Sequence, residues 1–513
     1  MKPWALQFFV NCLSIRISIM SNSYIIALDQ GTTSSRAALI NAKGDLIAME
    51  QQEFAQYFPK TDWVEHDPLE ILESQLLTFQ NLLKKTGVSA SEIVAIGIAN
   101  QRETTVVWNK RTGKPIYNAI VWQDKRTANI CEDLIEKGLE EHIRRTTGLV
   151  VDAYFSATKI HWILNHVPGA KQAAEKGDLL FGTIDTWLLW NFTKGKVHAT
   201  DYSNASRTLL YDIQNLCWDP IMLQALNIPV SMLPKVNPSS HLFGNFEMDA
   251  LSIPITGIAG DQQAALFGQA CFKKGAAKNT YGTGCFMLMN VGTNIQFSKN
   301  GLLTTIAWGI DSKIYYALEG SVFIAGSAIQ WLRDGLKIID SAEESEFFSN
   351  EVKEENPVVV VPAFAGLGAP YWDMYARGAI FGLTRDTGKN HLIKATLQSL
   401  AYQTKDVLLA MQEDAEIPIS TLKVDGGASA NNLLMQFQAD LLNTLVERPK
   451  ITETTAMGAA YLAGICVGLW KQEDILFHRK IEKEFSPEFS EEKRERLYKK
   501  WKKAVERTKN WID

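Results

Sequence analysis

The sequence predicts an α/β protein built from two similar halves with a ligand cleft between them. The first observation is residues 24–36, where five apolar residues lead into Asp29-Gln30-Gly31 and a run of small hydroxyl residues. The second is residues 279–289, about halfway along the chain, where a Gly-Thr turn again leads into an apolar strand. The 513 residues are also enough for two large domains or three average ones.

Residues 24–36 are predicted to form a buried strand and a tight turn, with a returning strand over residues 37–40. The turn presents backbone N–H groups beside the hydroxyls of Thr32, Thr33 and Ser34, an arrangement that suits phosphate oxygens. Asp29, at the end of the first strand, can hold Mg²⁺ there, because this cation prefers carboxylate and water oxygens. The turn is not a P-loop, since no Gly-Lys-Ser/Thr follows it. An ordinary hairpin with polar turn residues is the alternative.

The composition is that of a globular enzyme, with 46% hydrophobic and 21% charged residues. A net charge of −5 favours binding to neither nucleic acid nor an anionic membrane. The six cysteines are scattered without a CxxC pair, which indicates a reduced, cytoplasmic protein without structural zinc. No stretch of 18 apolar residues exists, so no membrane span is predicted.

The first 19 residues resemble a signal peptide only weakly. Arg16 interrupts their apolar run, no Ala-x-Ala cleavage site follows, and Tyr24 opens a core strand almost at once. We therefore expect residues 1–19 to be an N-terminal extension without a functional role.

The first half continues with a third strand over residues 46–54, a helix to about residue 85 and a strand over 93–98. Asp67 is predicted to cap the helix, with Pro68 as its first residue and Glu70 as the capping-box partner. Three strands, a helix and a fourth strand are the start of a ribonuclease-H-like α/β domain.

That fourth strand delivers Arg102 and Glu103, and catalytic groups on α/β sheets gather at the carboxyl ends of strands. An adjacent cation and anion can hold neighbouring hydroxyl groups, the anion accepting and the cation donating. A surface ion pair is the alternative.

The chemical centre is predicted at Asp261, which follows the apolar pair Ile258-Ala259 and Gly260 and opens a helix of small residues. Phosphoryl transfer to a primary alcohol needs removal of the alcohol's proton as the new P–O bond forms, and a nearby carboxylate supplies that base. Asp261 can also serve as a helix cap, and the two roles are compatible.

In the second half, residues 302–307 and 314–318 are predicted strands, and Ser321 is predicted to cap a helix that continues to Lys337. A strand over residues 422–424 leads into Asp425-Gly426-Gly427, where successive glycines let the backbone approach a flat base or a phosphate closely. The Ala- and Gly-rich residues 455–468 are predicted to form a tightly packed helix of this same half.

A C-terminal helix is predicted from Ser490 as its N-cap, with Leu497, Trp501, Ala504 and Val505 on one face. Its other face is basic, so contact with a membrane or a partner is one alternative. Docking of the Trp face onto the protein is the interpretation we adopt.

Several of these motifs together resemble the FGGY carbohydrate kinases of the actin-like ATPase superfamily. They are the two hairpins, residues 100–103, 154–163, 378–383 with 391–398, and 425–431, and the resemblance covers about residues 24–511. It implies two ribonuclease-H-like domains, residues 20–268 and 269–513, with a nucleotide cleft between them. Within the family, the chain resembles most closely the members that phosphorylate glycerol to sn-glycerol 3-phosphate with ATP and Mg²⁺. Another FGGY kinase, such as one for a pentulose, and a non-enzymatic actin-like ATPase are the alternatives.

The resemblance also implies roles for individual residues. Asp261 is the base, Asp29 and Arg36 are the other catalytic groups, and Asp29 is the metal ligand. The substrate-binding residues are Arg102, Glu103, Trp122, Tyr154, Asp261, Gln262 and Phe286. The nucleotide-binding residues are Thr32, Thr33, Ser34, Arg36, Thr283, Gly326, Gln330, Gly427 and Asn431. A homodimer or homotetramer is expected, as is common in this group of kinases.

Overall fold

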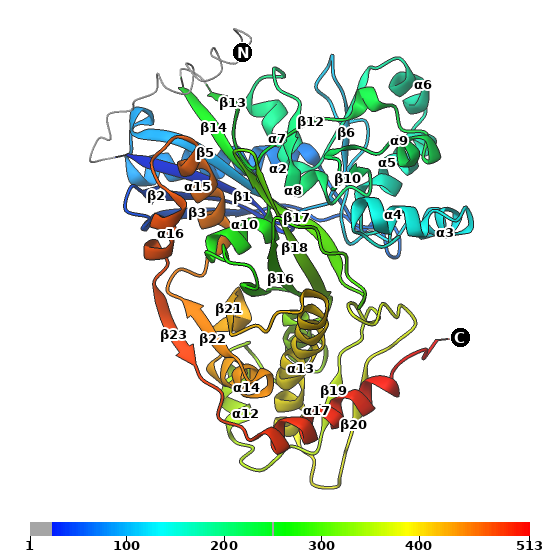
Figure 1. Ribbon diagram of the computed structural model, residues 1–513, viewed down its shortest axis with the longest axis vertical. Coiled ribbons are helices and arrows are strands. Elements are labelled where there is room, and N and C mark those ends of the chain that lie inside the picture. Colours follow the sequence, from blue (N-terminus) through cyan, green and yellow to red (C-terminus); the bar gives the residue numbers. More distant parts are fainter. Residues whose placement is uncertain (1–22, 249–250, 513) are drawn as a thin grey trace.

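One thirteen-stranded sheet runs through the whole protein and carries both halves (Figure 1). The computed structural model describes residues 23–248 and 251–512, so the predicted extension over residues 1–19 lies outside the described residues. From one edge to the other the strands are β3 (Leu46–Glu53), β2 (Ser34–Asn41), β1 (Tyr24–Gln30), β5 (Ile93–Asn100), β14 (Leu251–Gly260), β13 (Ser240–Met248), β17 (Leu303–Ile310), β18 (Lys313–Val322), β16 (Cys285–Gly292), β15 (Ala277–Tyr281), β21 (Thr421–Asp425), β22 (Leu445–Pro449) and β23 (Ile481–Phe485).

The two halves of this sheet repeat one strand pattern. In the first half, β1 pairs antiparallel with β2 and parallel with β5, and β5 pairs parallel with β14. In the second, β15 pairs antiparallel with β16 and parallel with β21, and β21 pairs parallel with β22. Each half therefore has the predicted ribonuclease-H-like arrangement. The halves meet where β13 pairs with β17 through the single residue pair Ser240 and Ile310.

Helices cover both faces of the sheet and build a side lobe on the first half (Figure 1). The helices are α2 (Pro68–Thr86), α3 (Ala128–Glu136), α4 (Glu140–Thr147), α5 (Ser156–His166), α6 (Ala170–Glu175), α7 (Ile184–Phe192), α8 (Tyr202–Ala205), α9 (Pro220–Ala225), α10 (Asp261–Gly268), α11 (Gly326–Gln330), α12 (Glu344–Asn350), α13 (Lys389–Ala415), α14 (Asn432–Leu442), α15 (Thr454–Cys466), α16 (Gln472–His478) and α17 (Glu491–Glu506). The short outlying strands are β4 (Glu65–His66), β6 (Val106–Asn109), β7 (Ala119–Ile120), β8 (Leu179–Gly182), β9 (Ala199–Asp201), β10 (Tyr211–Asp212), β11 (Cys217–Trp218), β12 (Lys235–Asn237), β19 (Val359–Val361) and β20 (Ala379–Phe381).

Helix α2 begins as predicted, because the Asp67 side chain accepts a hydrogen bond from the backbone N–H of Leu69 (2.8 Å) and Pro68 is its first residue. The capping-box role predicted for Glu70 is wrong. Its carboxylate instead accepts a hydrogen bond from the Tyr57 hydroxyl (2.6 Å), a partner distant enough in sequence to escape a local pattern.

Ser321 does not cap a helix. It lies inside β18, paired with Phe286 of β16, and the helix begins five residues later with α11. The strand is longer than predicted because residues 319–322 are buried and their backbone groups pair with β16, which satisfies hydrogen-bonding groups that would otherwise lack partners.

The C-terminal helix α17 is docked through its predicted face, with Ser490 accepting from the backbone N–H of Lys493. Trp501 is fully buried, stacks on Tyr402 at 5.2 Å and donates a hydrogen bond to Asp406 (2.7 Å). The helix is therefore part of the second half's core.

Helix α15 lies on the first half, although the sequence predicts it to be a helix of the second. It packs on β1, β5 and β14 and against α10, and in Figure 1 it lies among the strands of the first half. Glycines allow this approach, since a Cβ on Gly97 would lie 2.1 Å from the Ala459 carbonyl oxygen and one on Gly458 would lie 1.8 Å from that of Ala264. The prediction failed because it assigned the helix by its neighbours in sequence.

Candidate functional site

The turn between β1 and β2 is closed by a hydrogen bond from the Gly31 N–H to the Ser34 carbonyl oxygen (2.9 Å). Thr33 is exposed at its tip, whereas Ser34 is buried and its hydroxyl accepts from the Gln51 side-chain amide (3.1 Å). Of the three residues predicted to bind phosphate here, Ser34 is therefore buried within the hairpin, whereas Thr32 and Thr33 are at least partly exposed.

Asp29 lies at the inner end of this hairpin and is 4% exposed. Arg36, its partner on β2, approaches it at 3.4 Å and approaches Glu453 at the same distance. Burial raises the pKa of Asp29 to about 6, against the effect of Arg36, and the negative charges of Asp261 and Glu453 add to the rise. The positive charge near Asp29 is therefore not enough to offset the effect of burial on its pKa.

The second hairpin, between β15 and β16, is joined to the start of α11. Gly326 donates its N–H to the Gly282 carbonyl oxygen (3.0 Å), and a Cβ at residue 326 would lie 2.5 Å from that oxygen. Thr283 is exposed on the turn, and Gln330 is exposed one helical turn beyond Gly326. Three residues predicted to bind nucleotide are therefore brought together.

The glycine turn after β21 lies beside the same hairpin. Gly426 has a φ of +83°, and a Cβ there would lie 2.5 Å from the Tyr281 carbonyl oxygen. Gly427 faces open space, and Asn431 caps α14 by accepting from the Leu434 N–H (2.9 Å). The glycine turn after β21 thus packs against the second hairpin and leaves Gly427 free of close contacts.

A cavity of about 120 Å³ lies between the two hairpins. Its lining contains every residue that the sequence predicts to bind the polyol, together with one threonine from each hairpin: Thr32, Arg102, Glu103, Trp122, Tyr154, Asp261, Gln262, Thr283, Gly284 and Phe286. This volume is well below that of a typical pocket for a drug-sized ligand, roughly 300–1,000 Å³, so the cavity suits a very small molecule.

Aromatic rings form one side of the cavity. Trp122 packs edge-on against Tyr154 (5.5 Å between ring centroids) and Phe286 (6.0 Å). The indole N–H of Trp122 donates to the Thr32 hydroxyl (3.0 Å), which ties this wall to the first phosphate turn. Apolar rings and polar groups in one lining suit a ligand with both C–H and O–H groups.

The rest of the lining includes charged and polar groups. Asp261 Oδ1 accepts from its neighbour's backbone N–H, that of Gln262 (2.7 Å), and lies 3.3 Å from Arg102 Nε. Asp261 Oδ2 accepts from the Gln262 side-chain amide (3.2 Å). The Asp261 side chain keeps 28% of its surface exposed, so it faces the cavity while its orientation is held.

Lys278 of β15 is a site residue that the sequence did not reveal. Its ammonium donates to Gln262 Oε1 (2.5 Å) and to the Thr280 hydroxyl (2.7 Å), which turns the amide N–H₂ of Gln262 toward Asp261. Burial lowers the pKa of Lys278 to about 8, although Asp425 and Asp261 oppose this. A lysine within a buried strand is the signal that could have identified it.

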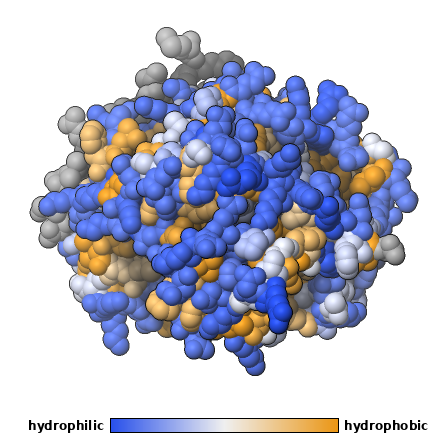
Figure 2. Space-filling model, turned by 90° about the horizontal axis from the view of Figure 1, so that it is seen from below, coloured by the Kyte–Doolittle hydropathy of each residue, from blue (hydrophilic) through white to orange (hydrophobic). Residues whose placement is uncertain are grey.

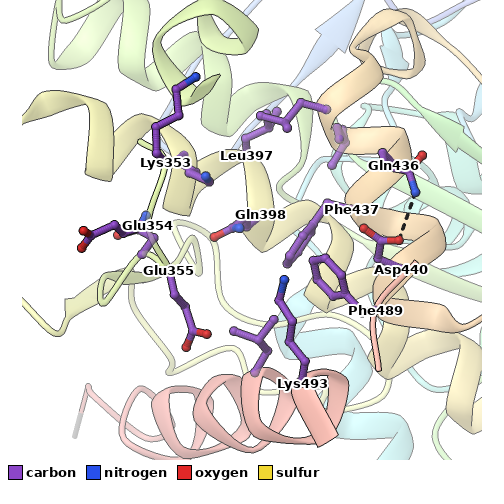
Figure 3. Close-up of a pocket in the computed structure, with 15 residues that line it drawn as sticks. Lys353, Glu354, Glu355, Leu397, Gln398, Gln436, Phe437, Asp440, Phe489 and Lys493 are labelled. Carbon is purple, nitrogen blue, oxygen red and sulfur yellow. Dashed lines mark hydrogen bonds between the residues drawn. The ribbon is translucent and has the colours of Figure 1, made fainter. Parts of the chain in front are cut away.

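A second cavity, of about 280 Å³, lies outside the cleft between α13, α14 and α17 (Figure 3). Phe437 and Phe489 form its centre, Lys493 lies over the Phe489 ring at 3.5 Å, and Asp440 accepts from Gln436 (3.0 Å). Its rim mixes three lysines with three carboxylates: Lys353, Lys394, Lys493, Glu354, Glu355 and Asp440. No predicted site residue lies here. The molecular surface at this end is mainly hydrophilic, with apolar residues scattered over it (Figure 2).

His161 and His166 do not form a metal site. Each hydrogen-bonds a backbone carbonyl oxygen, that of Leu226 (2.6 Å) and that of Trp162 (2.8 Å) respectively. Over residues 23–248 and 251–512, no group of three or more His, Cys, Asp or Glu is arranged to hold a metal ion. Within those same ranges, no helix has the length and apolar character needed to cross a membrane.

Comparison with known proteins matches both halves to one family. Residues 24–268 match the N-terminal domain of the FGGY family of carbohydrate kinases, and residues 277–467 match its C-terminal domain. A glycerol kinase of Caldanaerobacter subterraneus subsp. tengcongensis is 62% identical over 493 residues, 96% of this chain and 99% of that protein. One of Halorhodospira halophila is 60% identical over 495 residues, 96% of this chain and 98% of that protein.

Solved structures agree with this match. The crystal structure of Plasmodium falciparum glycerol kinase with ADP superposes with a TM-score of 0.88 at 38% identity, covering 95% of this chain and 98% of that one. Xylulose kinase from Lactobacillus acidophilus superposes with a TM-score of 0.83 at 21% identity, covering 93% and 96%, which shows the common fold alone.

Proposed function

The chain belongs to the FGGY family of carbohydrate kinases, and from this premise we propose that it transfers the γ-phosphoryl group of ATP to glycerol, giving sn-glycerol 3-phosphate. The observation that carries the choice of substrate is the small cavity, whose lining combines aromatic rings with Arg102, Glu103, Asp261 and Gln262. A three-carbon polyol has the size, the C–H face and the adjacent hydroxyls that such a lining binds. The identity to glycerol kinases over nearly the whole chain supports the same choice.

Asp261 is proposed as the base that accepts the proton of the terminal hydroxyl. As the new bond forms between that oxygen and the γ-phosphorus, the bond from phosphorus to the β,γ-bridging oxygen breaks and ADP leaves. The contacts of Asp261 with Arg102 and Gln262 hold the carboxylate in place before the reaction. Such a site speeds the transfer in two ways, by positioning the reactants and by removing the proton.

The backbone and hydroxyls of the two hairpins are proposed to hold the phosphates of ATP, with Thr32 and Thr33 on one side and Thr283 on the other. Gly326, Gln330, Gly427 and Asn431 are proposed to line the base and ribose. The contact of Gly326 with Gly282 and the approach of Gly426 to Tyr281 support this grouping.

Mg²⁺ fits beside Asp29, because a buried carboxylate with a raised pKa is short of positive charge. Mg²⁺ commonly binds through one or two carboxylates together with substrate phosphates and water. When bound, it would neutralise charge on the transferring phosphoryl group. Arg36 would then keep Asp29 oriented from the neighbouring strand.

A substrate panel tests this function. Glycerol, a pentulose, gluconate and a no-acceptor control are each supplied with ATP and Mg²⁺, and ADP release is followed by a coupled assay. Efficient turnover of glycerol alone is expected. Preference for the pentulose or gluconate would identify another FGGY kinase, and ADP release independent of every acceptor would identify an ATPase.

We also propose assembly into dimers or tetramers in the cytoplasm, where ATP is available. The resemblance to glycerol kinases supports this assembly, and light scattering on a size-exclusion column measures it directly. A monomer at working concentrations would contradict it.

A further inference from the structure

Four charged side chains form a cluster at the polyol cavity, each no more than 3% exposed. Arg102 and Glu103 follow β5, Arg207 follows α8, and Glu319 lies in the middle of β18. The first three belong to the first half of the protein, and Glu319 belongs to the second. Neither Arg207 nor Glu319 lines the cavity.

Glu319 binds both terminal nitrogens of Arg102. One carboxylate oxygen lies 2.5 Å from Arg102 Nη1 and the other lies 2.9 Å from Nη2, so the guanidinium is held as a two-pronged fork. This contact fixes the plane of the guanidinium and turns its Nε edge toward Asp261, 3.3 Å away. Although burial opposes it, the charges of Arg102 and Arg207 lower the pKa of Glu319 to about 2, so this carboxylate stays ionised.

Arg207 connects Glu319 to Glu103. Its Nε donates to Glu103 Oε1 (2.7 Å) and its Nη2 donates to Glu319 Oε1 (3.1 Å). With Oε1 of Glu103 occupied, the other carboxylate oxygen remains to accept from a ligand hydroxyl. The Glu103 backbone has a φ of +60° and its carbonyl oxygen accepts from the Ser156 hydroxyl (2.8 Å), so this residue is held from both its ends.

Stability alone does not account for this cluster. Removing four charges from water is costly, and well-packed apolar side chains of similar volume often serve a fold as well or better. The charges instead orient the two cavity residues, Arg102 and Glu103, because Glu319 and Arg207 each bind one of them.

We infer that Glu319 and Arg207 are positioning residues of the transfer reaction, which hold Arg102 and Glu103 in the geometry that binds the polyol. The inference rests on the proposed function and deepens it. It also means that both halves contribute to the polyol site, since Glu319 belongs to the second half of the sheet.

The test uses the full-length protein and the variants Glu319→Gln and Arg207→Lys, with KM and kcat for glycerol and for ATP measured separately. Misplacing a reacting or binding group by about 1 Å costs on the order of 10²-fold. We therefore expect KM for glycerol to rise about 100-fold in each variant, with KM for ATP unchanged. Calorimetric titration with glycerol in the absence of ATP should show the same loss of affinity without relying on turnover.

The matched control is Asp406→Asn, which changes a buried carboxylate of the second half that binds Tyr498 and Trp501, away from the cavity. It should lower the melting temperature and leave both KM values unchanged. The inference is overturned if KM for glycerol stays normal in a folded Glu319→Gln or Arg207→Lys variant. It is equally overturned if both KM values rise together as the melting temperature falls.

If Glu319→Gln fails to fold, Arg207→Lys still tests the inference, because lysine preserves the buried charge and loses only the two directed N–H contacts. The unchanged protein, assayed in parallel, separates this inference from the proposed function. Failure of that protein to phosphorylate glycerol would refute the function, whereas normal glycerol affinity in the variants would refute only the positioning roles.

Discussion

Replacing Asp261 with asparagine keeps the volume and one oxygen but removes the ability to accept a proton. In the favourable orientation the asparagine oxygen takes the place of Oδ1 and keeps the contacts with the Gln262 N–H (2.7 Å) and Arg102 Nε (3.3 Å). Its amide nitrogen then faces the Gln262 side-chain nitrogen, where the wild-type distance is 3.2 Å and both groups would be donors. Gln262 cannot simply turn over, because Lys278 donates to its oxygen.

Two effects of different size follow. Loss of the base should lower kcat by roughly 10²–10⁴-fold. Loss of one hydrogen bond at Gln262, about 0.5–1.5 kcal/mol, should weaken polyol binding by no more than about tenfold. The signature is therefore a large fall in kcat with a modest rise in KM for glycerol and little change in KM for ATP, measured by steady-state kinetics with the coupled ADP assay.

The control is Asp67→Asn, the same chemical change at a carboxylate that serves only as the cap of α2. Asparagine caps helices as well as aspartate does, so activity and stability should both remain normal. Near-normal turnover of glycerol by Asp261→Asn would refute the proposed base. A fall in melting temperature without a fall in kcat would show Asp261 to be structural.

Four further outcomes are expected. Asp29 has a raised pKa of about 6, against an ordinary value of 3.8. Its ionised form therefore lowers the free energy of unfolding above pH 6, and this loss of stability disappears as the pH falls below 4. Asp29→Asn should therefore raise the melting temperature at pH 7 while lowering turnover, and in the unchanged enzyme the activity should fall below about pH 6 and be restored partly by added Mg²⁺. Gly458→Ala should cost about 1–3 kcal/mol in urea unfolding, since its Cβ would overlap the α10 backbone, whereas Gly388→Ala, whose Cβ meets nothing within 4 Å, should cost less, because it loses only the preference for glycine over alanine at the N-cap of α13. Deleting residues 490–513 should lower the melting temperature, because it removes the fully buried Trp501, and an unaltered melting temperature would contradict the docked helix. Small-angle scattering should show a smaller radius of gyration with nucleotide and glycerol together than with nucleotide alone, and equal values would count against closure of the cleft.

Local patterns in the sequence were sufficient for most of the first half's fold. The β1–β2 hairpin, the cap at Asp67 and the strand before Arg102 each depend on residues within one or two turns of the chain. The seven predicted polyol-binding residues converge on one cavity for a similar reason, because the strand-end rule and the family's motifs both mark the same sheet edge.

What the sequence did not reveal depends on distant partners. Glu319 and Arg207 are buried ionic residues to which no role could be assigned from the sequence, although residues 201–207 resemble the family, and only the pairing of β16, β18 and β17 brings Glu319 to Arg102. Lys278 escaped prediction because its partner, Gln262, belongs to the other half of the protein. The extent of β18 through Ser321 was missed because burial and pairing with β16 overrode the local helix-cap signal.

The position of α15 determines when the protein can be completed during its synthesis. N-terminal domains generally fold as the ribosome releases them. Here β1, β5 and β14 emerge early, but the helix that covers them is made of residues 454–466, close to the end of the chain. During synthesis the first half therefore exposes the apolar surface that α15 later covers. A chain that ends before this helix cannot complete the fold of either half. The two halves of the sheet repeat one plan, yet they reach their native state together.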